Sequence, residues 1–328
     1  MPESWKKPGK AAKLMRIELS SICNFRCRFC CWENPRGQRG AKLSPKYLSL
    51  LCTALGRTGC HHVNLTGGEP LLLNTDTLCK AVEAIASSKD IWQFWVTTNG
   101  ARLRNIRFCR QLAAAGLRKL AVSIAAETDD KYKFYTRTNV TLTDVLNGIK
   151  NAIAVGIEVK VHVPLNPDGV GDFNQLISLI HRCEDVGVKT LYYFRLHDSL
   201  VIHDRYDELY RSPEAITTQF AKSTDWTYGE SISGRPYFTD GRIQVQVPRE
   251  SIRLVTENCL SRDCGQFCQG TYAAYLVPGI TGLHVRACHR VFADKNNEFS
   301  LDIALLERGD IDGVAAIFEQ VWKYAHEV

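Results

Sequence analysis

The chain has 328 residues, 45% of them hydrophobic, and a formal net charge of +6 at pH 7. This length and composition can bury a large core, and the mild charge, with no Lys/Arg block, allows an anionic substrate but argues against a nucleic-acid partner. No run of about 18 apolar residues occurs, and the basic N-terminus lacks an apolar signal core, so we expect no membrane partner and a cytoplasmic location. The thirteen cysteines are odd in number, which is typical of metal ligands and buried thiols rather than of a disulfide framework.

Strand-like and helix-like segments alternate along the first two thirds of the chain. The expected strands are 14–21, 61–69, 93–99, 119–126, 158–166 and 189–196, and the expected helices are 44–59, 74–89, 106–116, 143–156 and 172–187. Regular alternation predicts a parallel sheet with helices outside it. Periodicity leaves open whether the sheet closes partway into a barrel or stays open and doubly wound. In both cases ligands bind at the carboxyl ends of the strands.

The pattern changes near residue 212. Residues 212–234 are polar and irregular, residues 235–248 predict a hairpin that turns at Asp240-Gly241, and residues 310–327 predict an amphipathic helix. We therefore predict a core domain over residues 1–212 and a smaller C-terminal domain over residues 213–328.

Cys23, Cys27 and Cys30 follow the first strand in a Cx3Cx2C loop at the expected mouth of the sheet. Three thiolates from one loop can hold an iron–sulfur cluster and leave one iron without a protein ligand. A structural zinc ion is the alternative, but it requires four ligands, and only the adjacent Cys31 is near enough to supply the fourth.

The loop, with Phe29 before its last cysteine, resembles the hallmark of the radical SAM superfamily, and further motifs of that family follow in order at later strand ends. The resemblance implies a partial (β/α)6 TIM-like barrel, a 4Fe-4S cluster, S-adenosylmethionine (SAM) and a flavodoxin- or ferredoxin-type electron donor. It also implies reductive cleavage of SAM to a 5′-deoxyadenosyl radical. The residues that it assigns to the SAM site are Phe29, Gly67, Gly68, Glu69, Pro70, Thr98, Asn99, Ser123, Arg137 and Asn166. Glu69 is expected at the SAM amino group, Arg137 at the methionine carboxylate and Asn166 at the ribose.

A second cysteine group comprises Cys259, Cys264, Cys268 and Cys288. Its spacing resembles the auxiliary-cluster regions called SPASM and Twitch, with the shorter Twitch type fitting better, and implies an auxiliary 4Fe-4S cluster. The sequence leaves open whether three or four of these thiolates bind the cluster, and a zinc site with four cysteines is the alternative.

Residues 14–27 and 135–166 also resemble the GTP cyclase family of molybdenum-cofactor biosynthesis. That family has arginines after its second C-terminal cysteine and basic residues after GGEP, whereas this chain reads "CQGTYAAY" and "LLLN" there, so we do not expect GTP cyclisation. Arg16 and Glu18 share one face of the first strand, and Arg195 and His197 follow the sixth, which predicts that these four contact the substrate. A structural ion pair between Arg16 and Glu18 is the alternative.

The expected function is hydrogen abstraction from a small polar, anionic molecule, namely a sugar acid, nucleoside or nucleotide derivative. Dehydrogenation, decarboxylation or rearrangement in specialised metabolism would follow, with a nucleoside-sugar decarboxylase as the specific guess. A peptide-modifying maturase and a non-catalytic zinc or RNA-binding protein are the alternatives.

Overall fold

The computed structural model describes residues 12–30, 42–196, 203–231, 235–248, 271–278, 283–287 and 298–327. Six parallel strands and the helices between them make up its first part. The strands are β1 Ala12–Ser20, β2 His62–Gly67, β3 Gln93–Thr98, β4 Lys119–Ser123, β5 Glu158–Leu165 and β6 Thr190–Arg195. The helices are α1 Leu48–Arg57, α2 Thr75–Ala86, α3 Ile106–Ala114, α4 Asp129–Thr136, α5 Leu142–Ala154 and α6 Phe173–Asp185.

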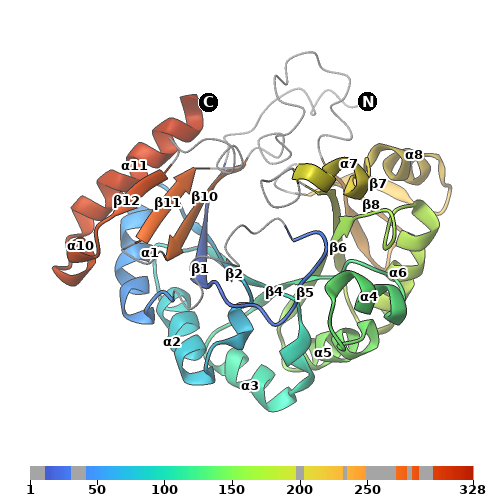
Figure 1. The fold of residues 1–328 in the computed structure, drawn as a ribbon, viewed down its shortest axis with the longest axis horizontal. Coiled ribbons are helices and arrows are strands. Elements are labelled where there is room, and N and C mark those ends of the chain that lie inside the picture. The colour runs from blue at the N-terminus through green and yellow to red at the C-terminus, as the bar shows by residue number, and fades with distance from the viewer. Residues whose placement is uncertain are drawn as a thin grey trace.

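The strands curve into an arc that does not close on itself, and the helices cover its outer side (Figure 1). In the described residues the strand order is β12-β11-β10-β1-β2-β3-β4-β5-β6-β9-β8-β7. Pairing is parallel from β10 through β1 to β6 and on to β9, and antiparallel at both edges. The expected partial barrel is therefore confirmed.

Short-range signals explain where the helices begin and end. Thr141 and Asp144 form a capping box at the start of α5, and Asp172 and Gln175 form another at the start of α6. Each box satisfies backbone N–H groups that have no partner inside the helix. Gly156, with φ of 86°, and Gly187, with φ of 91°, follow these helices in the left-handed conformation that ends a helix.

The two faces of the parallel strands carry different side chains. Val63, Leu65 and Val96 are fully buried on the outer face, where they pack against the helices in the main hydrophobic core. On the inner face Asn64 of β2 donates to Thr97 Oγ1 of β3 at 2.9 Å. Because side chains alternate along a strand, the inner face of the arc is polar and the core lies between the strands and the helices.

Residues beyond 205 extend the sheet at both ends. The remaining elements are α7 Tyr206–Leu209, α8 Glu214–Lys222, β7 Thr227–Glu230, β8 Pro236–Thr239, β9 Gln244–Gln246, β10 Thr271–Pro278, β11 Leu283–Ala287, β12 Glu298–Leu301, α10 Ile303–Glu307 and α11 Ile311–Glu327. The hairpin β8–β9 turns at Asp240-Gly241, as predicted, and α11 confirms the predicted C-terminal helix. Trp322 Nε1 of α11 donates to Thr58 Oγ1 at 3.0 Å, which fixes α11 beside the end of α1. The division of the chain at residue 212 stays a prediction, and strands from its C-terminal side join the same sheet as β1 to β6.

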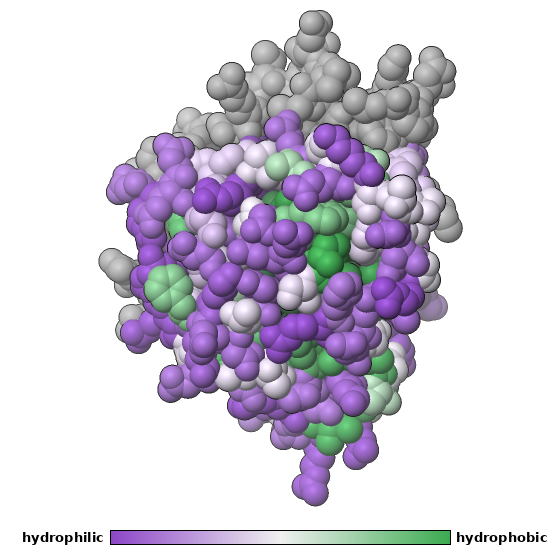
Figure 2. Space-filling model, turned by 90° about the vertical axis from the view of Figure 1, so that its right-hand side faces the viewer, coloured by the Kyte–Doolittle hydropathy of each residue, from purple (hydrophilic) through white to green (hydrophobic). Residues whose placement is uncertain are grey.

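Four of the described helices were not expected: α4, α8 and the shorter α7 and α10. Helix α4 lies between the predicted strand 119–126 and helix 143–156, and α8 lies in a segment expected to be irregular. The face that carries α6 and α8 is mostly hydrophilic, with a smaller hydrophobic area near its middle (Figure 2). Among the described helices, none combines the length and the apolar character needed to cross a bilayer.

Candidate functional site

The loop that carries Cys23, Cys27 and Cys30 leaves β1 and crosses the opening of the arc towards α4 (Figure 1). Cys30 N donates to Cys27 O at 3.2 Å, and Phe25 N donates to Cys23 Sγ at 3.4 Å. Cys23 and Cys30 are exposed, and Cys27 is half-buried. The buried Phe25 ring anchors the loop, so the thiols stand at the carboxyl end of the sheet.

Backbone hydrogen bonds hold this loop on two sides. Gly68 N donates to Ser20 O and Glu69 N to Ile22 O, both at 2.8 Å. On the other side the backbone amides of residues 26 and 28 donate to the carbonyls of residues 136 and 135, at 3.1 and 2.8 Å. The cysteine loop is therefore fixed between the end of β2 and the last turn of α4.

The two glycines of the GGE motif are required by this contact. A Cβ atom at Gly67, whose φ is 132°, would lie 2.4 Å from Ser20 O, and one at Gly68 would lie 2.4 Å from Ile22 O. Backbone atoms cannot move aside as a flexible side chain can. The glycines thus allow close approach of the cysteine loop itself, a role that the spacing did not indicate.

The carboxylate of Glu69 lies beneath the loop and accepts three hydrogen bonds. Its Oε1 accepts from Thr98 Oγ1 at 2.7 Å and from Leu71 N at 2.9 Å, and its Oε2 accepts from Asn99 N at 2.6 Å. Burial raises the pKa of Glu69 to about 7, against the lowering effect of these bonds. An ammonium group placed beside Glu69 would favour the charged carboxylate, as the predicted contact with SAM requires.

Further contacts connect the ends of β2 and β3 to the cysteine loop. Asn99 Nδ2 donates to Asn24 Oδ1 at 2.9 Å. Pro70 begins a short 3-10 helix, Pro70–Leu72, and the guanidinium of Arg102 donates to Leu71 O and Leu73 O, each at 2.6 Å, and to Thr75 Oγ1 at 2.8 Å. The predicted residues Thr98 and Asn99 are thus part of the support of Glu69 and of the loop.

The thiols lie close enough to affect one another. Although Cys23 is exposed as a residue, loss of water around its thiol raises the pKa of Cys23 to about 11, opposed by the Phe25 amide, and the Glu69 carboxylate and the Cys30 thiol raise it further. Burial, Cys30 and Cys23 likewise raise the pKa of Cys27. In the described part of the chain no three His, Cys, Asp or Glu side chains form a group that could hold a single metal ion. A 4Fe-4S cluster takes each thiolate on a different iron, so three neighbouring thiols on one loop fit it without converging on one point.

The other residues assigned to the SAM site differ in their accessibility. Phe29 lies 5.9 Å from Tyr135, measured between ring centroids. Ser123 ends β4, and Arg137 is exposed at the end of α4 with φ of 50°, a conformation that is uncommon for residues other than glycine. Asn166 is fully buried.

The amide group of Asn166 is occupied within the protein. Its Nδ2 donates to Ala125 O at 2.8 Å and to Pro164 O at 3.0 Å, and its Oδ1 accepts from Gly169 N at 2.6 Å. Asn166 therefore organises the loop after β5, and a contact with ribose would add to these bonds or replace one of them.

Of the four residues expected to contact substrate, the structure describes Arg16, Glu18 and Arg195, whereas His197 lies outside the described residues. Glu18 is fully buried, and the Arg16 guanidinium carbon lies 5.4 Å from the centroid of the Tyr275 ring on the neighbouring β10. Arg195 is half-buried at the end of β6. Cys259, Cys264, Cys268 and Cys288, with the predicted auxiliary cluster, also lie outside the described residues.

Sequence reasoning missed a group of basic residues inside the arc. Burial, and then the nearby Lys160, Arg16 and Arg235, lower the pKa of His162 well below its usual range. Lys160 Nζ and Arg235 both donate to the side-chain oxygen of Gln246, the Arg235 contact measuring 3.4 Å. The segment "EVKVHVPL" has polar residues at every second position, and this alternation could have identified Lys160 and His162.

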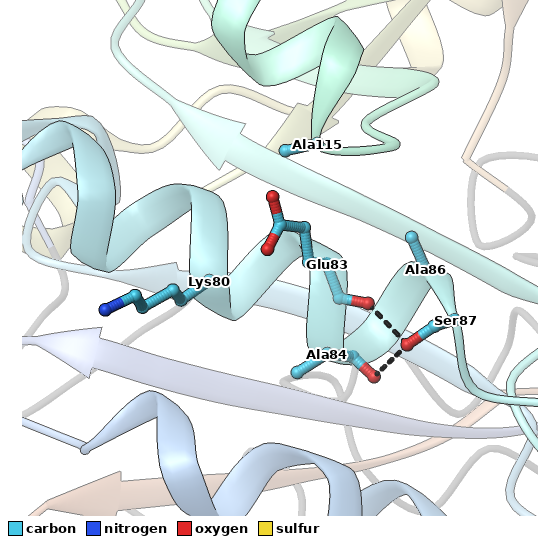
Figure 3. Close-up of a pocket in the computed structure, with 6 residues that line it drawn as sticks. All are labelled: Lys80, Glu83, Ala84, Ala86, Ser87 and Ala115. Carbon is cyan, nitrogen blue, oxygen red and sulfur yellow. Dashed lines mark hydrogen bonds between the residues drawn. The ribbon is translucent and has the colours of Figure 1, made fainter.

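A surface hollow lies at the opposite end of the strands. Figure 3 shows it beside the last turns of α2, with Ser87 Oγ donating to Glu83 O at 2.7 Å. Helix α2 runs back from the carboxyl end of β2, so this hollow is remote from the cysteine loop, and its lining carries no thiol. It is not the site. The lining residues are Lys80, Glu83, Ala84, Ala86, Ser87 and Ala115.

Residues 17–189, slightly more than half of the chain, match the model of the Radical SAM superfamily. The chain belongs to this superfamily and is an enzyme of it, a membership that implies a 4Fe-4S cluster and SAM. Among curated proteins it is similar to the GTP 3′,8-cyclase of Staphylococcus epidermidis, with 32% identity over 180 residues covering 53% of this chain and 51% of the relative. The GTP 3′,8-cyclase of Moorella thermoacetica is 33% identical over 170 residues, covering 49% of this chain and 51% of the relative. The chain thus matches these relatives over about half of their length.

Solved structures give the same fold at low identity. Streptococcus suis SuiB bound to SAM has a TM-score of 0.50 and 16% identity, covering 62% of this chain and 44% of SuiB. HydG, a maturase of the [FeFe]-hydrogenase, has a TM-score of 0.54 and 16% identity, covering 64% of this chain and 48% of HydG. These likenesses show the fold alone.

Proposed function

We propose that this enzyme cleaves SAM reductively at the Cys23, Cys27 and Cys30 loop and abstracts hydrogen from a small anionic substrate held inside the arc. When bound, the cluster and SAM together supply the 5′-deoxyadenosyl radical that removes the hydrogen. The observation that carries the substrate class is a group of basic side chains, namely Arg16 of β1, Lys160 and His162 of β5, and Arg235, which directly precedes β8.

The chain's own residues have separate tasks in this proposal. The three thiolates bind the cluster, while Glu69 receives the SAM amino group and Arg137 the methionine carboxylate, for which a planar guanidinium is suited. The left-handed backbone of Arg137 supports this assignment, because such strain is found at functional sites.

Two members of the basic group donate to a neutral acceptor. Lys160 and Arg235 share the carboxamide oxygen of Gln246. Burial, and then Arg235, lower the pKa of Lys160 well below its usual range, against the nearby Glu158 carboxylate, which raises it. A carboxylate or phosphate bound here would reverse that shift, because an opposite charge favours the protonated amine. The negative charge of the proposed substrate therefore complements the basic side chains of the site.

The ring of Tyr192 lies close to the basic groups of Lys160 and Arg235. Lys160 Nζ lies 5.0 Å and the Arg235 guanidinium carbon 5.6 Å from the centroid of the Tyr192 ring. The His162 ring meets the same tyrosine edge to face at 5.8 Å between centroids. Contacts of this kind hold basic groups against an aromatic ring. An anionic sugar acid, nucleoside derivative or nucleotide derivative has the charge that this region suits.

The cleavage step is tested with protein reconstituted with iron and sulfide under anaerobic conditions. Dithionite and SAM are added, and 5′-deoxyadenosine is measured by liquid chromatography and mass spectrometry. We expect product from the wild type and none from Cys27→Ala, with Cys60→Ala as the control, because Cys60 is fully buried away from the loop and should leave cleavage intact. A wild type that binds iron yet forms no 5′-deoxyadenosine would refute the proposal.

The substrate class is tested by stimulation of 5′-deoxyadenosine formation. The probes are uridine diphosphate glucuronic acid, glucuronic acid and uridine monophosphate, with uridine as the uncharged control. We expect an anionic probe to stimulate the wild type and the stimulation to fall at least tenfold in Lys160→Met. Lys119→Met is the matched control, because Lys119 is exposed on β4 and pairs with Glu158 at 3.6 Å. If an anionic probe stimulated Lys160→Met and Lys119→Met equally, the basic group would have no role in substrate binding.

We further propose an auxiliary 4Fe-4S cluster on Cys259, Cys264, Cys268 and Cys288. The support is their number and spacing in the C-terminal domain predicted over residues 213–328. Iron analysis of the wild type and of Cys264→Ala/Cys268→Ala tests it: about eight irons falling to about four supports two clusters, and an unchanged value near four excludes the second. The peptide-modifying alternative stays a prediction.

A further inference from the structure

Tyr132 lies in the middle of α4, the helix whose last turn holds the cysteine loop. Its ring meets the ring of Phe25 edge to face at 6.4 Å between centroids, and Phe25 lies between Cys23 and Cys27. The tyrosine is therefore packed against the cysteine loop.

The hydroxyl group of Tyr132 is buried without a hydrogen bond. The side chain is 0% exposed, and its oxygen has no hydrogen-bond partner among the residues that the structure describes. Burial, and then the nearby Cys27 thiol and Glu69 carboxylate, raise the pKa of Tyr132, so the phenol is neutral and keeps its proton. A phenylalanine would fill the same space without a buried polar group, so packing alone does not account for the hydroxyl.

Of the Cys27 thiol and the Glu69 carboxylate, only Cys27 is available as an acceptor for the Tyr132 hydroxyl when the cluster and SAM are bound. The Glu69 oxygens already accept from Thr98, Leu71 and Asn99. Cys27 becomes a thiolate when it binds iron, and a thiolate sulfur accepts hydrogen bonds readily. The sulfur of Cys27 is therefore the acceptor that forms together with the cluster.

We propose that Tyr132 is a positioning residue whose hydroxyl donates a hydrogen bond to the Cys27 sulfur once the cluster is bound. The inference rests on the cluster that the family implies at Cys23, Cys27 and Cys30. A hydrogen bond to a cluster sulfur stabilises the reduced, more negative state, so it raises the reduction potential. It also holds the half-buried Cys27 ligand in one orientation, as outer-shell partners of metal ligands do.

The test compares Tyr132→Phe with Tyr135→Phe in reconstituted enzyme. Tyr135 is the matched control because it lies on the same helix and its hydroxyl already donates to Asp168 at 3.4 Å. The midpoint potential is measured by redox titration followed by electron paramagnetic resonance, with iron content determined on the same samples. We expect Tyr132→Phe to bind as much iron as the wild type and to have a more negative potential, with Tyr135→Phe unchanged. The cluster-free Tyr132→Phe protein should melt at or above the wild-type temperature, because it loses an unsatisfied buried hydroxyl.

An unchanged potential in Tyr132→Phe at full iron content would overturn the inference. A wild type without iron would instead refute the cluster, so the two failures are distinguishable. Should Tyr132→Phe fail to load iron, 3-fluorotyrosine is placed at position 132 instead, because its more acidic hydroxyl donates a stronger hydrogen bond. A midpoint potential above that of the wild type at equal iron content supports the hydrogen bond, and an unchanged potential overturns it.

Discussion

Replacing Gly68 with alanine tests whether the GGE motif positions the cysteine loop. The new Cβ would lie 2.4 Å from Ile22 O, 2.5 Å from Ile22 C and 2.7 Å from Ser21 O. Close contacts between carbon and oxygen measure about 3.3–3.6 Å, so the loop and the turn must separate by roughly 1 Å. That separation breaks or lengthens the bonds from Gly68 N to Ser20 O and from Glu69 N to Ile22 O, now both at 2.8 Å.

The cost follows from these contacts. Overpacking of this kind costs about 1–3 kcal/mol, and each weakened hydrogen bond adds about 0.5–1.5 kcal/mol. We expect Gly68→Ala to lower the free energy of unfolding of the cluster-free protein by about 2–6 kcal/mol. The cysteine loop would also be displaced relative to Glu69, so iron uptake on reconstitution should fall together with stability.

Guanidinium unfolding followed by circular dichroism measures the first effect, and iron and sulfide analysis measures the second. Gly59→Ala is the control: its φ is 71° and its Cβ meets nothing within 4 Å, so it reports the cost of a left-handed alanine alone, about 1–2 kcal/mol. Gly59 is remote from the thiols, and iron uptake should stay normal. If Gly68→Ala matched the wild type in both measurements, the close contact between the GGE turn and the cysteine loop would not exist in solution.

Three further outcomes follow from the same contacts. Burial raises the pKa of Glu69 from 4.5 to about 7, so the stability that this group gives the cluster-free protein should be highest below pH 4.5. It should fall by about 3 kcal/mol as pH rises through 7. The free energy of unfolding of wild type and Glu69→Gln is measured between pH 5 and 8, and an equal dependence on pH in both proteins would contradict this. Partial burial would raise the pKa of Asp240, but hydrogen bonds from Arg242 and from Ile243 lower it to about 2, so the stability it gives is present above pH 3.8 and lost as pH falls through 2. Asp240→Asn should therefore cost on the order of 1–2 kcal/mol at pH 7 and less at pH 2, measured by urea unfolding at both pH values. Arg102→Met removes three hydrogen bonds to the turn after the GGE motif and should cost roughly 2–4 kcal/mol by thermal unfolding, and a variant as stable as the wild type would contradict the contacts.

The local architecture of this enzyme was determined by its sequence alone. Alternation, caps and glycines act over a few residues, and they predicted the six parallel strands, the hairpin at Asp240-Gly241 and the C-terminal helix. The spacing of Cys23, Cys27 and Cys30 also indicated the cluster loop, because three ligands on one loop need no distant partner. Helix α4 escaped prediction because it is short and strongly polar, with few apolar positions to mark a face.

Only the tertiary structure decided which distant residues share a site. The contact of Arg16 with Tyr275, and that of Lys160 with Gln246, depend on strand registers between segments far apart in the chain. No local pattern contains such a register, since it is set by the whole sheet. For the same reason the buried hydroxyl of Tyr132 became apparent only once α4 was packed against the cysteine loop.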